Sequence, residues 1–210
     1  LVIGAGWIGE ARDRLPELPD AKFERFLLQY GLSAYDAATL TASKGTADFF
    51  EAILLDWEVT TLPLETKSKT VSNWVLTDLN RLANMAGVEV NKSRVTSKGM
   101  AGLLRLVDGG VISGSVGKTV LEEMFESGNG AEEIVRERGL TQISDDDVVR
   151  GLVDEVVEGN PQAVEDYKAG KDRAMAFLVG QIMKATKGQA NPGLVNTFLK
   201  IRLDGGNGSP

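Results

Sequence analysis

Apolar residues recur at helical spacing along most of the chain. After Pro19, four large apolar side chains stand at positions i, i+3, i+4 and i+7, namely Phe23, Phe26, Leu27 and Tyr30. This spacing places them on one side of an α-helix, and Gly31 is a natural end for it. Comparable stripes follow at 49–57, 74–82, 100–107, 116–125, 131–138, 148–157, 171–187 and 192–201. The sequence shows no convincing alternation of apolar and polar residues, so the pattern predicts an all-α fold.

Polar residues mark where several of these helices begin. Ser33, Thr96 and the run 144–147 offer side-chain oxygens to the free amides of a helix start. Asp145, Asp146 and Asp147 also suit the positive end of the helix dipole. Three carboxylates could instead bind Mg²⁺ or Ca²⁺. Because consecutive residues of a helix point in different directions, the pattern favours capping over a metal site.

The last two predicted helices carry both apolar and basic residues. The helix over 171–187 is predicted to place Phe177, Leu178, Gln181, Ile182 and Ala185 on one face. Its basic residues Lys184 and Lys187 lie near the C-terminal end, where the helix dipole favours positive charge. Asn191-Pro192 then starts a final helix, with Leu194, Val195, Phe198, Leu199 and Ile201 as its apolar set.

Composition removes several kinds of chemistry. The 210 residues include no cysteine and no histidine, which excludes disulfides, a thiol nucleophile, an imidazole base and a zinc site built from those residues. Any enzyme here would depend on carboxylates, lysines and hydroxyl groups. No apolar run approaches the roughly 18 residues of a membrane helix. We therefore expect a binding or scaffolding protein that does not associate with a membrane.

Two glycine-rich segments resemble nucleotide-binding loops but lack their context. Gly4, Gly6 and Gly9 match the G-x-G-x-x-G dinucleotide fingerprint, but no βαβ unit can be built from the helical pattern beyond them, which favours a linker. Residues 112–119 resemble a phosphate-binding loop that ends in Gly-Lys-Thr. Ile112 occupies the position that requires the first glycine, so a helix-starting turn is favoured.

Charge is unevenly distributed. The formal net charge is −7, and residues 145–167 alone hold one basic and eight acidic side chains. From Lys168 onward the sign reverses, with seven Lys or Arg against two Asp or Glu. A local basic face is therefore expected at the C-terminal end, although the chain as a whole is acidic.

Several motifs resemble the C-terminal part of the GatB/YqeY family, to which the GatB proteins of aspartyl/glutamyl-tRNA amidotransferase belong. The most distinctive is FLVGQIMKATKGQANPGLVN at 177–196. Other matching segments are LPELP at 15–19, YGLSAYDA at 30–37, and residues 40–41, 47–51, 73–74, 140–145, 160–161, 164–165 and 167–171. Because these motifs occur in order along nearly the whole chain, the resemblance is specific.

The resemblance implies a domain organisation. We expect a linker at 1–14 from a missing N-terminal catalytic domain, a multi-helix domain at 15–140, a YqeY-like tail domain of three or four helices at 141–205, and a disordered end at 206–210. ATP and Mg²⁺ would bind in the missing domain, so no cofactor site and no catalytic residue is expected in this fragment. The parent would be a cytoplasmic carbon–nitrogen ligase that works with subunits A and C.

The resemblance also implies that the tail binds tRNA(Gln) or tRNA(Asn) and positions it for conversion of Glu-tRNA(Gln) or Asp-tRNA(Asn) to the amide. The expected phosphate contacts are Lys184, Lys187 and Asn191, with weaker contributions from Lys168, Lys171, Arg173 and Lys200. The acidic helix at 145–158 would repel phosphate, so only the opposite face of the tail should approach RNA. The alternative is a protein-interaction scaffold like stand-alone YqeY.

Overall fold

The computed structural model describes residues 17–58, 61–171 and 173–205. Within these ranges the regular structure is helical, apart from an isolated parallel β-bridge between Ile143 and Ala190. The predicted all-α fold is therefore confirmed. In the described part of the chain, no helix has the length and apolar character needed to cross a membrane. The segments predicted as a linker at 1–14 and a disordered end at 206–210, and the glycines at 4–9, lie outside the described residues.

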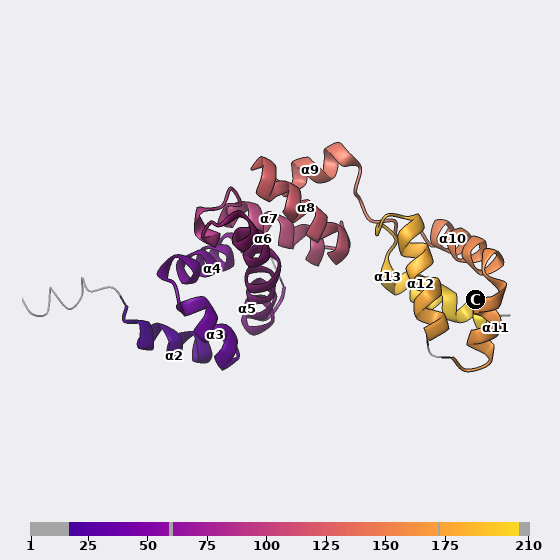
Figure 1. Ribbon diagram of the computed structural model, residues 1–210, viewed down its shortest axis with the longest axis horizontal. Coiled ribbons are helices and arrows are strands. Elements are labelled where there is room, and N and C mark those ends of the chain that lie inside the picture. The colour runs from indigo at the N-terminus through magenta and orange to yellow at the C-terminus, as the bar shows by residue number, and fades with distance from the viewer. Residues whose placement is uncertain (1–16, 59–60, 172, 206–210) are drawn as a thin grey trace, which may run out of the picture. The chain divides into compact units, whose positions relative to one another are not determined.

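The described helices form two compact units that divide between Ser93 and Arg94. The first unit contains α2 (Pro19–Tyr30), α3 (Ala34–Thr41), α4 (Lys44–Asp56), α5 (Leu64–Asn73), η1 (Trp74–Leu79), α6 (Asn80–Ala86) and η2 (Val90–Lys92) (Figure 1). The second contains α7 (Ser97–Asp108), α8 (Gly114–Ser127), α9 (Ala131–Arg138), α10 (Asp146–Gly159), α11 (Pro161–Lys168), α12 (Arg173–Ala185) and α13 (Pro192–Leu203). The boundary predicted between residues 140 and 141 stays a prediction.

An aromatic cluster lies at the centre of the first unit, next to a partly buried ion pair. The ring of Phe26 lies 5.2 Å from that of Tyr30 and 5.3 Å from that of Phe50, centroid to centroid. Tyr30 donates a 2.6 Å hydrogen bond to Glu51, which also accepts a 2.6 Å bond from Arg25. Burial, together with the hydrogen bond to the Glu51 carboxylate, raises the pKa of Tyr30 to about 12.

The segment Trp74–Leu79 is a π-helical turn and not the α-helix that its spacing predicts. The buried residues Val71, Val75, Leu79 and Ala83 recur at intervals of four. In an α-helix each such step advances roughly 40° beyond a full turn, so the stripe would drift around the helix. A wider π turn reduces this drift and keeps the four side chains directed toward the core.

The predicted capping residues occupy the helix starts. The side chains of Ser33 and Thr96 accept hydrogen bonds from the amides of Asp36 and Gly99, at 3.1 and 3.0 Å. In the run 144–147 it is Asp145 that caps α10, with its Oδ1 accepting from two backbone amides. The segment 112–119 likewise begins a helix, because Ser113 caps α8 and the Gly-Lys-Thr residues lie within that helix. These outcomes confirm capping as the role favoured by the sequence.

Candidate nucleic-acid interface

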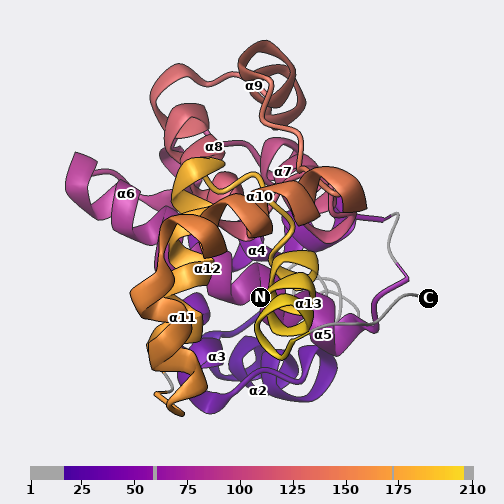
Figure 2. The ribbon, with the colours of Figure 1, turned by 90° about the vertical axis from the view of Figure 1, so that its right-hand side faces the viewer.

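The basic C-terminal segment is carried by the tail helices, which we define as α10–α13. Helices α10, α12 and α13 pack together and bury a common core, while α11 lies alongside α12 (Figure 2). The core residues are Val149, Val153, Val157, Leu178, Ile182, Ala190, Val195, Phe198, Leu199 and Leu203. Because each of these helices turns its apolar side inward, its polar side is left exposed to carry charge.

The exposed face of α12 carries an ordered row of residues. Arg173, Phe177, Gly180 and Lys184 are all exposed and follow one another at intervals of four, three and four. At about 100° per residue, Arg173 and Lys184 differ by only about 20° in direction and stand about 16 Å apart along the helix axis. We call this row the α12 face. It presents a cation near each end and an aromatic ring between them.

Phe177 does not lie on the buried side of α12, so the predicted stripe is wrong at this position. The buried residues of the helix are Ala174, Leu178 and Ile182, whereas Phe177 is 48% exposed. Leu178 points into the core, and its neighbour Phe177 is turned about 100° away from it. Ala185, also assigned to the buried face, is exposed at the C-terminal end of the helix. Spacing alone could not reveal their exposure, because Phe177 and Ala185 are both apolar and therefore look suited to a buried face.

Lys168 and Lys171 lie at the turn between α11 and α12. Both are exposed, and the Nζ atom of Lys171 lies 2.8 Å from Oδ1 of Asp166. This hydrogen bond holds the pKa of the Asp166 carboxyl below its usual value. The two lysines also line a hollow of about 670 Å³. On its wall Tyr167 donates a 2.8 Å hydrogen bond to Asp204. Part of the positive charge at this turn is thus neutralised locally.

Lys187 and Asn191 stand at the corner between α12 and α13. Lys187 is exposed and has a backbone φ of 52°, the left-handed region, so the predicted helix ends before it. The side chain of Asn191 caps α13, because its Oδ1 accepts hydrogen bonds from the amides of Gly193 at 2.9 Å and Leu194 at 3.2 Å. Its Nδ2 lies 3.4 Å from the Gln142 side-chain oxygen. Asn191 therefore has a structural role, and its predicted RNA contact stays a prediction.

Charges on α10 and α13 partly cancel one another. Arg202 pairs with Asp154 at 2.7 Å, and the guanidinium of Arg150 lies 4.2 Å above the ring of Phe198. Within the part of the tail that the structure describes, Lys200 is exposed and forms no ion pair. The phosphate-binding potential of α13 is therefore smaller than its sequence suggests.

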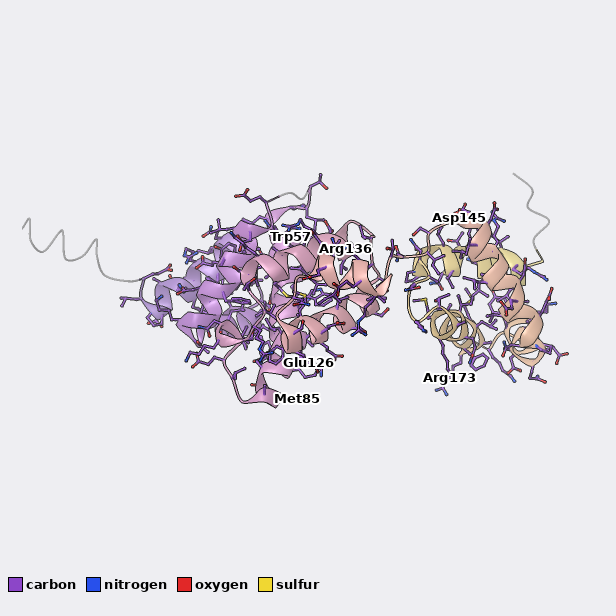
Figure 3. The ribbon with its side chains drawn as sticks, turned by 90° about the horizontal axis from the view of Figure 1, so that it is seen from above. Trp57, Met85, Glu126, Arg136, Asp145 and Arg173 are labelled. Carbon is purple, nitrogen blue, oxygen red and sulfur yellow. The ribbon has the colours of Figure 1, made fainter. Side chains whose placement is uncertain are left out.

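Asp145, at the acidic start of α10, lies apart from Arg173, at the start of α12. Figure 3 shows Asp145 and Arg173 on opposite edges of the tail. Across the described ranges, Arg173, Lys184 and Lys187 form no ion pair, while Asp172 lies outside those ranges. The structure brings Arg173 and Lys184 onto the α12 face, with Lys187 just beyond its end. Lys168 and Lys171 stand at the turn before α12, and Lys200 lies on a separate helix.

Residues 59–203 match the family described as the GatB domain. The chain belongs to the GatB domain family. That membership includes all of the tail helices, and it agrees with the family suggested by the motifs.

Three similar proteins illustrate the relationship, and each is named as the B component of aspartyl/glutamyl-tRNA(Asn/Gln) amidotransferase. Those of Moorella thermoacetica and Thermoanaerobacter sp. (strain X514) are 49% and 48% identical over 203 residues, and that of Geobacillus kaustophilus is 45% identical over 199 residues. The matches cover 97%, 97% and 95% of this chain but only 41%, 41% and 40% of the relatives, in the same order. The chain thus spans about two fifths of the length of these relatives.

Proposed function

We propose that this GatB domain chain is the tRNA-binding and positioning part of a cytoplasmic tRNA-dependent amidotransferase that acts with subunits A and C. Its substrate would be Glu-tRNA(Gln) or Asp-tRNA(Asn), which the complete enzyme converts to the amide form. The ATP- and Mg²⁺-dependent chemistry belongs to the part of the enzyme outside this chain. The tail helices hold the tRNA body through phosphate contacts.

The observation that carries this proposal is the α12 face together with Lys187. The three cations Arg173, Lys184 and Lys187 are exposed on one helix and its C-terminal corner, and that helix packs on a buried core. Cations on a helix can contact phosphates at fixed spacing, which sets the position of a folded RNA without reading its sequence. The acidic start of α10 at Asp145 lies on another edge of the tail (Figure 3). This arrangement favours approach of RNA from one side.

The test is a fluorescence-anisotropy titration of the chain with folded tRNA(Gln) and with an unstructured RNA of equal length, at two salt concentrations. We expect tighter binding of the folded tRNA, because the tail presents a fixed shape. Replacing Lys184 and Lys187 together by Glu should weaken binding by at least tenfold. The Lys92→Glu, Lys98→Glu double variant changes net charge equally at two exposed lysines outside the tail and should bind nearly normally.

A second function is favoured by a different observation, the exposed apolar side chains of the first unit. Leu28 is 87% exposed, Tyr35 and Met85 are each 77% exposed, and Leu55 is 71% exposed. Aromatic residues and methionine are enriched in protein interfaces, so Tyr35 and Met85 favour such a surface. If the charge-reversed tail variant binds tRNA as tightly as the unaltered chain, a protein-interaction scaffold replaces the RNA-binding proposal.

A further inference from the structure

A groove opens beside the α12 face. It has a volume of about 610 Å³ and lies between the end of α10, the first turn of α11 and the first turn of α12. Its wall includes Phe177, Pro161 and Ala174, and its rim includes Arg173 and Lys171. The size falls within the roughly 300–1,000 Å³ of small-molecule sites. The groove thus combines an open apolar floor with positive charge at its mouth.

The exposed aromatic ring is the central feature of this groove. Phe177 lies one helical turn after Arg173 and is 48% exposed, so a large apolar surface remains in contact with water. A planar ring so placed suits stacking with another planar ring, and single-stranded RNA sites use aromatic side chains in this way. Asn160 and Gln162 also line the groove, and their amide nitrogens already donate to the Val156 carbonyl at 2.8 Å and to Asp166 at 3.4 Å. Their side-chain oxygens can accept a hydrogen bond from the polar edge of a nucleobase.

The positive charge at the rim of the groove suits the phosphate backbone of an RNA strand that carries such a base. Arg173 and Lys171 are exposed cations, and Asp166, the carboxylate in the groove, is paired with Lys171 at 2.8 Å. A phosphate near Arg173 would therefore meet a positive group, while the Asp166 carboxylate in the groove is already partnered by Lys171. Further along the α12 face, Lys184 continues the positive path.

We propose that this groove holds one unstacked nucleobase of the bound tRNA, with its ring against Phe177 and a flanking phosphate near Arg173. The inference rests on the proposed function and deepens it. The tail would bind tRNA at a place where a base is turned out of the helical stack, and not along a fully paired duplex. A free nucleotide has the same chemistry, so the experiment separates the two sources.

The experiment uses the full chain and the anisotropy titration with folded tRNA. Phe177→Ala should weaken binding by about 5- to 150-fold, the range for loss of one base–aromatic stack. Phe177→Tyr keeps the ring and should restore most of the affinity, whereas Phe177→Leu keeps apolar bulk without the ring and should not. Val148, 49% exposed on α10, supplies the matched control. Val148→Ala should change affinity by less than about twofold, because it removes no stacking partner.

The salt dependence of tRNA binding distinguishes stacking on the Phe177 ring from phosphate contacts made by the cations. The slope of log Kd against log salt should be unchanged in Phe177→Ala, because no phosphate contact is lost. In Arg173→Ala it should fall by about one. Far-UV circular dichroism checks that each variant remains folded.

Each contrary outcome has a distinct meaning. Full affinity in Phe177→Ala or in Phe177→Leu overturns the nucleobase site while leaving tRNA binding by the tail intact. Displacement of the tRNA by micromolar nucleoside monophosphates would assign the groove to a free nucleotide and also overturn the inference. If the unaltered chain binds no tRNA, both the site and the proposed function fail.

Discussion

The hydroxyl group of Ser113 donates a 2.6 Å hydrogen bond to the carbonyl oxygen of Gly188, 75 residues later in the chain. The same Oγ accepts from the amide of Val116 and thereby caps α8. A second long-range bond, from the Gln189 side chain to the Gly139 carbonyl at 3.0 Å, lies beside it. Hydrogen bonds therefore tie the corner that follows α12 to the start of α8 and to the end of α9.

Ser113→Ala should lower the free energy of unfolding by roughly 1–3 kcal/mol, because it removes both a helix cap and a hydrogen bond. Urea unfolding followed by circular dichroism measures the change. Ser113→Thr keeps the hydroxyl group and should lose much less. Equal stability of the alanine variant and the unaltered chain would show that the Ser113–Gly188 bond contributes nothing.

Gly188→Ala should also destabilise the protein. Gly188 has φ of 80°, and a Cβ atom there would stand 2.9 Å from the Ser115 Oγ. The left-handed conformation alone costs a residue with a side chain roughly 1–2 kcal/mol. Gly180→Ala is the matched control, since Gly180 is exposed within α12 and a Cβ there meets nothing within 4 Å. It should stabilise by about 0.5–1 kcal/mol, and thermal denaturation of both variants checks the opposite signs.

Asn191 offers a way to separate a structural role from an RNA contact. Asn191→Asp preserves the cap of α13, because aspartate caps as well as asparagine, whereas Asn191→Ala should cost about 1 kcal/mol of stability. If the amide touches phosphate, the aspartate variant should bind tRNA several-fold more weakly while its unfolding midpoint stays the same. Unchanged affinity in that variant would confine Asn191 to the cap.

Tyr30 makes stability depend on alkaline pH. Its pKa is raised to about 12 in the folded chain, from the model-peptide value of 10.0. The folded state thus holds the phenolic proton more tightly than the unfolded state. This contribution is complete below pH 10 and is lost as the pH rises toward 12, with an upper limit of roughly 2–3 kcal/mol. Urea unfolding from pH 8 to 12 should show a smaller decline in Tyr30→Phe. Parallel curves would contradict the prediction.

The sequence predicted local features better than distant ones. Ser33, Thr96 and Asp145 could be identified as caps because capping depends on the few residues that follow. The exposure of Phe177 depends on which side of α12 meets α10 and α13, and an apolar side chain gives no sign of this. The Ser113–Gly188 bond joins residues too far apart in sequence for any periodic pattern to connect them.

The candidate site was predictable to a similar degree. The charge reversal at Lys168 located the basic segment, but composition could not show that Arg202 is paired with Asp154 or that the Asn191 side chain is used in a cap. Nor could it distinguish Lys200, which lies on α13 beside the paired Arg202, from Arg173 and Lys184, which share the α12 face. Which cations form ion pairs, and which way each side chain points, is decided only when the helices pack together.

The left-handed backbone of Lys187 sets the stability of the corner after α12 against the charge that it carries. Among the described residues it is the one non-glycine residue with positive φ, a conformation in which glycine would be more stable. A chain shaped only by folding would favour glycine here. We expect Lys187→Gly to raise thermal stability and to weaken tRNA binding, because it relieves the strain and removes a cation. At this corner, a change that increases thermal stability would then decrease tRNA binding.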